Sequence, residues 1–189
     1  MKKKKIDFES VGWSGSCHLS ALSLLDTFFQ FYDLPTAKNL LVEMMAYNGK
    51  AKVLRKDNPS EVFHFYLALR SLVRAGYRMQ FKAEKPEFQA PAEPVSVSVL
   101  MLGSLSEEEY RKPFLALQKT FSKLTLRDFD RFLTDLTYFA LGTFRKGPEG
   151  DPVTPFLQLN RILDAAQLIV ERAGMTSSIK SEGVLHEKR

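Results

Sequence analysis

The chain contains 189 residues, of which 44% are hydrophobic and 26% are charged, and it carries a formal net charge of +5 at pH 7. This balance is typical of a folded globular protein and excludes an intrinsically disordered or membrane-embedded chain. No window approaches the roughly 18 uninterrupted apolar residues of a membrane span, and acidic residues at Asp7 and Glu9 follow the N-terminal lysines, which argues against an export signal.

Six segments carry apolar residues at the three- and four-residue spacing that predicts amphipathic helices. Proline or glycine interrupts the pattern between several of them, for example at Pro35 and Gly142. Ser106 and Glu109 have the spacing of a capping box at the start of one segment. The predicted helices cover about residues 17–33, 35–48, 58–76, 106–124, 125–141 and 151–174.

The helix predicted over residues 58–76 has the clearest boundary signals. Asn58 and Pro59 occupy the N-cap and first helical positions, and Glu61 follows three residues after the cap, as in a capping box. Gly76 is expected to end this helix, because glycine is common just past a helix C-terminus. The sequence therefore predicts one central helix, with the other helices arranged around it.

Beyond Gly76 the apolar period changes from the helical value to two, which is typical of a strand. This alternation predicts strands over about 77–85 and 95–102, joined by the proline-rich loop 85–94. Two strands joined in this way form an antiparallel β-hairpin inserted mid-chain. The predicted fold class is therefore α+β, predominantly α-helical, with about six helices.

The same patterns predict one globular domain with two tails. Residues 1–16 form a basic N-terminal tail with a short edge strand considered for Ile6–Glu9, and residues 17–174 form the domain. Residues 175–189 are polar and are expected to be a loosely ordered C-terminal tail.

The positive charge is unevenly distributed along the chain. Without residues 1–5 and 175–189 the chain has 20 basic and 20 acidic residues, so the body is neutral. Within that body, residues 50–82 have a net charge of +6, which leaves −6 on the remainder. The eight basic residues of this segment are the candidate binding residues: Lys50, Lys52, Arg55, Lys56, Arg70, Arg74, Arg78 and Lys82.

This asymmetry favours a non-enzymatic interaction protein, such as a small subunit or adaptor, whose basic surface meets an anionic protein partner or a second copy of the chain. The alternative is sequence-independent nucleic-acid binding through the same residues and the N-terminal lysines, which would be strongly salt-dependent. Both hypotheses require the eight basic side chains to converge on one face. If each is neutralised by a neighbouring acid, the segment is an ordinary solvated face.

A remote alternative is a cysteine-dependent hydrolase. The first predicted helix starts with Gly15, Ser16 and Cys17, followed by Ser20 and Ala21. This segment resembles the nucleophile segment of papain-like cysteine proteases, which would imply that Cys17 acts as a nucleophile. The chain departs from that family at His18, where an aromatic residue is expected, and at Val11, where the oxyanion-hole glutamine is expected. A small residue at a helix start is the preferred interpretation of Cys17.

No other sequence pattern indicates a catalytic, metal or cofactor site. The three histidines and the single cysteine lack metal-ligand spacing, and no glycine-rich phosphate loop is present. We therefore predict no catalytic residue, no metal and no cofactor. A lone cysteine cannot form an internal disulfide, which favours a reducing, cytoplasmic location without a membrane partner.

Overall fold

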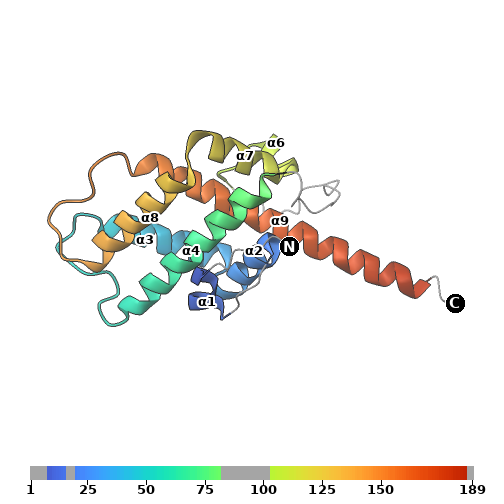
Figure 1. The fold of residues 1–189 in the computed structure, drawn as a ribbon, viewed down its shortest axis with the longest axis horizontal. Helices are drawn as coiled ribbons and strands as arrows, with labels where there is room; N and C mark the ends of the chain where they lie inside the picture. The colour runs from blue at the N-terminus through green and yellow to red at the C-terminus, as the bar shows by residue number, and fades with distance from the viewer. Residues whose placement is uncertain (1–7, 16–19, 82–102, 187–189) are drawn as a thin grey trace, which may run out of the picture.

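A computed structural model describes residues 8–15, 20–81 and 103–186 of the chain. Every regular element in these ranges is a helix, and the helices pack into one body (Figure 1). Their bounds are α1 Phe8–Ser14, α2 Ala21–Phe31, α3 Leu34–Tyr47, α4 Pro59–Met79, α6 Glu107–Arg111, α7 Pro113–Lys123, α8 Leu126–Leu141 and α9 Val153–His186.

Helix α4 is the centre of the fold, as its boundary signals predict. It packs against α1, α2, α7, α8 and α9, and it crosses the middle of the body in Figure 1. The side chains of Phe65, Leu69 and Leu72 have no exposed surface. Because α4 has neighbours on several sides, it is buried around more of its circumference than the one wide face of an ordinary amphipathic helix.

The predicted β-hairpin is wrong, and with it the α+β fold class. Helix α4 continues through Gly76 to Met79, so residues 77–79 are helical where the first strand was expected. Gln80 and Phe81 form a turn at the end of the helix, and residues 82–85 and 95–102 lie outside the described residues. The helical spacing in fact persists across the glycine, since Leu72, Gly76 and Met79 are all buried. The described part of the chain is all-helical.

Gly76 has a packing role in place of the predicted stop. A Cβ atom at this position would lie 3.5 Å from side-chain carbons of both Ile162 on α9 and Leu117 on α7. The glycine therefore lets three helices approach closely. Its φ is outside the left-handed region that a helix-ending glycine adopts.

Replacing Gly76 with alanine separates these two roles. A Cβ at 3.5 Å makes an ordinary contact, and alanine in a helix interior is favoured over glycine by about 0.5–1 kcal/mol. We expect Gly76→Ala to leave the free energy of unfolding unchanged or to raise it, as measured by urea denaturation. A loss of about 1 kcal/mol would show that the glycine ends the helix in a left-handed conformation.

The N-terminal segment contributes to the core. Helix α1 begins at Phe8, so the edge strand considered for residues 6–9 is replaced by helix from that point onward. Trp13 is 3% exposed, and its indole Nε1 donates a hydrogen bond of 3.0 Å to Ser71 Oγ on α4. The backbone carbonyl of Trp13 lies 3.1 Å from His64 Nε2, also on α4. These contacts fix α1 against the central helix.

The helix starts follow the sequence signals in most cases. The Ser106–Glu109 capping box is present, with both reciprocal hydrogen bonds. Asn58 makes no side-chain cap, and Glu61 instead pairs with Arg55. The helix predicted over residues 106–124 is divided into α6 and α7, because Pro113 cannot continue a helix and starts a new one.

Helix α9 is longer than its predicted counterpart. Its backbone continues past Gly174 to His186, through most of the segment expected as a tail. Figure 1 shows this last part extending away from the other helices. The part of α9 that packs in the body includes Leu159, Ile162 and Ile169, all without exposed surface.

Candidate interaction surface

Three of the eight predicted binding residues are neutralised within the fold. Arg55 binds Glu61 and Glu43, with N–O distances of 2.9 and 3.2 Å. Arg70 and Arg74 both face one carboxylate of α8, Asp130, at 2.9 and 3.4 Å. These two arginines connect α4 to α8, so they serve the packing of the helices.

The predicted set also fails to converge on one face. Helix α4 has 21 residues, which corresponds to a length of roughly 30 Å. Lys50, Lys52 and Lys56 precede its first turn, whereas Arg78 lies in its last turn. Lys82 lies outside the described residues. The predicted surface is therefore divided between the two ends of the central helix.

Lys50, Lys52 and Lys56 are exposed in the loop between α3 and α4. Leu54 fixes the loop: its side chain is 3% exposed, and its amide donates a hydrogen bond of 2.8 Å to the carbonyl of Ala140 on α8. The three lysines are thus presented at the end of the molecule where α8 finishes. Lys50 Nζ also lies 5.1 Å from the centre of the Tyr47 ring.

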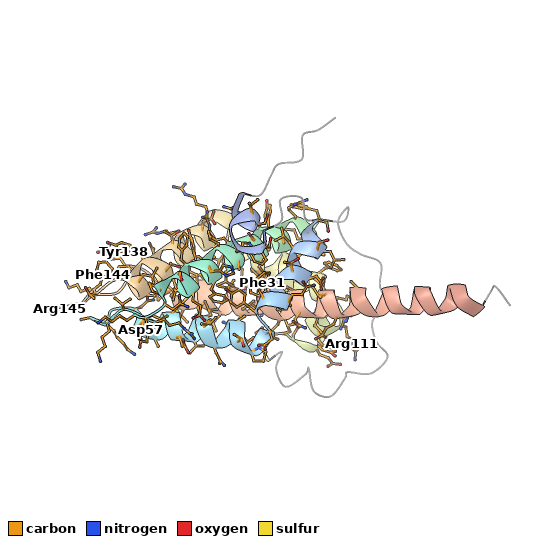
Figure 2. The ribbon with its side chains drawn as sticks, turned by 90° about the horizontal axis from the view of Figure 1, so that it is seen from below. Phe31, Asp57, Arg111, Tyr138, Phe144 and Arg145 are labelled. Carbon is orange, nitrogen blue, oxygen red and sulfur yellow. The ribbon has the colours of Figure 1, made fainter. Side chains whose placement is uncertain are left out.

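The loop between α8 and α9 brings two further cations to the same end, Arg145 and Lys146, both exposed. A Cβ on Gly49 would lie 3.1 Å from the backbone nitrogen of Gly147, so the two loops touch at their backbones. Figures 1 and 2 show these loops side by side at one end of the body. Gly49 has a φ of +74°, a conformation that glycine adopts without strain.

We call the exposed cations of these two loops, apart from the paired Arg55, the loop-end surface. None of them pairs with a carboxylate among the residues whose side chains are described. Three exposed acids, Asp57, Glu149 and Asp151, lie in the same loops. The positive charge therefore exceeds the negative charge at this end. The loop-end surface consists of Lys50, Lys52, Lys56, Arg145 and Lys146.

Residues 50–82 contain three of these cations, whereas Arg145 and Lys146 lie about 90 residues further along the chain and were not predicted. An Arg–Lys pair in a glycine- and proline-containing loop is a detectable signal of exposed positive charge. Its proximity to the α3–α4 loop depends on tertiary structure, which spacing cannot show.

Three aromatic side chains lie beside the loop-end surface. Tyr138 and Phe144 are stacked, with ring centroids 4.6 Å apart and an interplanar angle of 29°. Phe139 meets both rings edge-on, at 5.4 and 5.1 Å. The position of Phe144 depends on Gly142, because a Cβ there would lie 2.0 Å from Phe144 Cε2. Glycine therefore leaves the space that the Phe144 ring fills.

Two neighbouring hollows border the α8–α9 loop, and four residues line both: Arg131, Asp135, Pro148 and Glu149. One has a volume of about 330 Å³ and is acidic, since its lining includes Asp128, Asp135, Glu149 and Asp151 against the single cation Arg131. The other is more open and is lined by Phe139, Phe144, Arg145 and Lys146, together with Arg131, Asp135, Gly147, Pro148 and Glu149. The second hollow joins aromatic rings to two cations of the loop-end surface.

The acidic residues of the body are largely engaged in the fold. Asp33, Asp128 and Asp151 each accept hydrogen bonds at a helix start, and these bonds hold the pKa of each carboxyl below its ordinary value. Asp164 has no exposed surface; it pairs with Lys38 at 2.5 Å and accepts a hydrogen bond of 2.5 Å from Ser104 Oγ. The acidic excess outside residues 50–82 is thus distributed mainly among caps and ion pairs, and two of the capping carboxylates, Asp128 and Asp151, also line the acidic hollow.

The cysteine hypothesis lies largely outside the described residues, because Cys17 is among the residues whose placement is not described. His64 occupies a structural position: its Nδ1 is 2.5 Å from Tyr32 Oη, and its Nε2 faces the Trp13 carbonyl. Burial, followed by the charge of Glu61, raises the pKa of Tyr32 to about 12. Both rings therefore connect α1, α2 and α4.

In the described ranges no helix is long and apolar enough to cross a bilayer, and no three His, Cys, Asp or Glu side chains are grouped as metal ligands. No family model matches the chain, and no curated protein or solved structure is significantly similar to it.

Proposed function

We propose that the protein is a non-enzymatic interaction protein, a small subunit or adaptor, that meets an anionic partner through the loop-end surface. The observation that carries this proposal is the meeting of two loops, distant in sequence, whose five exposed cations form no ion pair with the described carboxylates. Clustered like charges raise the local concentration of an oppositely charged partner and speed its association.

The geometry favours the two loops over the arginines of α4 as the binding surface for an anionic partner. Arg70 and Arg74 already bind Asp130, and a partner would have to displace that carboxylate before it could use them. The loop cations require no such exchange.

The test compares charge reversals at two places. In Lys50→Glu/Lys146→Glu, one cation of each loop is reversed, while the arginines of α4 are kept. The probes are a short poly-glutamate peptide and a short single-stranded oligothymidine, each labelled for fluorescence anisotropy. We expect at least about tenfold weaker binding of the preferred probe and a shallower dependence of affinity on salt, because fewer counterions are released.

The matched control is Lys123→Glu/Arg127→Glu, which makes the same change in net charge with two exposed residues where α7 ends and α8 begins. The start of α8 lies roughly 20 Å along the helix from its other end. It keeps the loop-end surface and should bind nearly as the wild type does. Equal losses in both variants would mean that only net charge matters. Failure of the wild-type protein to bind either probe at low salt would contradict the proposal.

We also propose a cytoplasmic location. It is supported by the single cysteine of the sequence, which leaves no internal disulfide to form.

A further inference from the structure

We propose that the anionic partner is a single-stranded nucleic acid, held by stacking of a base on the Tyr138–Phe144 pair and by phosphate contacts with the loop-end surface. This inference rests on the proposed function and specifies its partner. Proteins that bind single strands without sequence preference combine cations that follow the backbone with aromatic rings on which bases stack.

The aromatic pair is arranged as a stacking platform. Phe144 lies against one face of Tyr138 at 4.6 Å, and Tyr138 remains 59% exposed, the largest fraction among the exposed large hydrophobic side chains of the described residues. A base added to the outer side of Tyr138 would extend a stack that already contains two rings. Phe139 supports both rings edge-on and so limits their movement.

The position of the platform depends on glycine. The Phe144 ring fills the space that a side chain at residue 142 would occupy, with ring carbons 2.0 and 2.7 Å from the expected Cβ position. Any other residue at Gly142 would displace the ring. The stacked arrangement is therefore specified by the sequence Gly142-Thr143-Phe144 and does not arise from chance contact of two exposed rings.

The phosphate-binding groups lie directly after the platform in the chain. Arg145 and Lys146 follow Phe144, and all three line the same open hollow. Figure 2 shows Tyr138, Phe144 and Arg145 at one end of the molecule. The α3–α4 loop, which touches Gly147, adds Lys50 and Lys52 beyond them. A strand stacked on Tyr138 can thus continue along cations from both loops.

The neighbouring surface limits where a strand can run. The neighbouring acidic hollow shares Arg131, Asp135 and Glu149 with the open hollow. Its two further carboxylates, Asp128 and Asp151, repel phosphate. The strand is therefore directed away from Asp128 and Asp151 and toward the α3–α4 loop. The proposed site therefore has an acidic side and a basic side.

The exposed aromatic stack beside the loop cations favours single-stranded nucleic acid over other polyanions. An acidic protein would satisfy the lysines but would make no use of an exposed aromatic stack beside them. Duplex DNA hides its base faces and is usually read by a helix or ribbon placed in a groove, whereas this surface consists of loops. Single-stranded bases present their π-faces and can stack on aromatic side chains.

The experiment uses the full chain and measures anisotropy with two labelled strands of equal length, an oligothymidine and its abasic counterpart. Both strands carry the same phosphates, so the difference between their affinities for the protein reports the contribution of the bases alone. We expect the wild-type protein to bind oligothymidine at least about tenfold more tightly, as stacking of one base predicts. Tyr138→Leu and Gly142→Ala should abolish most of this difference while the salt dependence stays unchanged.

The control variant is Phe31→Leu, which changes an aromatic residue that is 53% exposed on α2, away from the loop-end surface (Figure 2). It should retain the preference for bases. Circular dichroism of each variant checks that a loss of base preference is not caused by unfolding. Tyr138→Leu and Gly142→Ala support the inference only if their helical signal and melting temperature match those of Phe31→Leu.

Equal affinity for the two strands, or an unchanged base preference in a folded Tyr138→Leu, would overturn the inference and leave the proposed function in place. Tighter binding of poly-glutamate, of a duplex of the same length or of phosphatidylserine vesicles would do the same. No binding to any of these polyanions would contradict both.

Discussion

Trp13→Ala should lower the free energy of unfolding by about 3–5 kcal/mol, the range for removal of a buried large aromatic side chain. Trp13 is 3% exposed and contacts the rings of Phe28 and Phe31 at centroid distances of 6.5 and 5.7 Å. Its removal leaves a cavity between α1, α2 and α4 and also removes the indole bond to Ser71, which is itself fully buried. Urea denaturation followed by circular dichroism measures this loss.

Two variants show what the tryptophan contributes. Trp13→Phe keeps most of the apolar surface but leaves the Ser71 hydroxyl without its donor, which should cost about 1–3 kcal/mol. Val11→Ala changes a residue of the same helix that is 44% exposed, and it should alter stability by less than about 0.5 kcal/mol. A loss below 1 kcal/mol in Trp13→Ala would show that α1 does not belong to the core.

Glu109→Ala is expected to cost about 3 kcal/mol, because it removes one partner of a buried ion pair. The Glu109 side chain is 2% exposed. It accepts a hydrogen bond of 2.9 Å from the Ser106 amide, pairs with Arg161 of α9, and lies 3.4 Å from Lys119 Nζ of α7. Three helices therefore depend on this carboxylate, and alanine would leave Arg161 partly buried without its acid.

The pH dependence of Glu109 has a defined sign. Burial alone would raise the pKa of this carboxyl, but the Ser106 amide, Arg161 and Lys119 together outweigh it and hold the pKa below its ordinary value of 4.5. A carboxyl with a lowered folded pKa adds stability above its unfolded pKa and loses it as pH falls through the folded pKa. The difference in stability between the wild type and Glu109→Gln should therefore be full at neutral pH and shrink below about pH 4.5.

The matched control for this position is Glu107→Gln, two residues earlier in α6. Glu107 has an 80% exposed side chain and pairs with Arg111 in the same helix. An exposed pair of this kind contributes about 0.2–1 kcal/mol, so the control should change stability little. Two results would contradict the described contacts of Glu109. One is a Glu109 variant that lowers the free energy of unfolding as little as Glu107→Gln does, and the other is a difference in stability from the wild type that grows as the pH falls.

Local signals predicted the helices well where the chain carries its own boundary residues. Pro59, the Ser106–Glu109 capping box and Thr125 all stand at observed helix starts. These signals act within one turn of helix, so a single sequence contains them completely.

The failure at Gly76 has a different cause. Glycine after an apolar helical segment is found both at helix ends and at close helix crossings, and the local sequence is the same in both cases. What distinguishes them is the approach of Leu117 and Ile162, from helices about 40 and 85 residues later. The alternation of Tyr77 and Met79 with polar residues then supported the wrong choice.

The candidate surface was predictable only in part. Charge counting identified Lys50, Lys52 and Lys56 but also Arg70 and Arg74, because it could not show that Asp130 would face the two arginines. It likewise missed Arg145, Lys146 and the aromatic stack. These groups join the surface only through contact between two loops, which is a tertiary event.

The most direct test of the binding surface is a titration of ¹⁵N-labelled protein with oligothymidine, followed by amide chemical shifts. The account predicts shifts concentrated in residues 48–57, at the end of α8 and in residues 142–152, with Arg145 and Lys146 among the largest. Shifts centred on the Arg70–Arg78 side of α4 or on the N-terminal lysines, with the two loops unchanged, would contradict it.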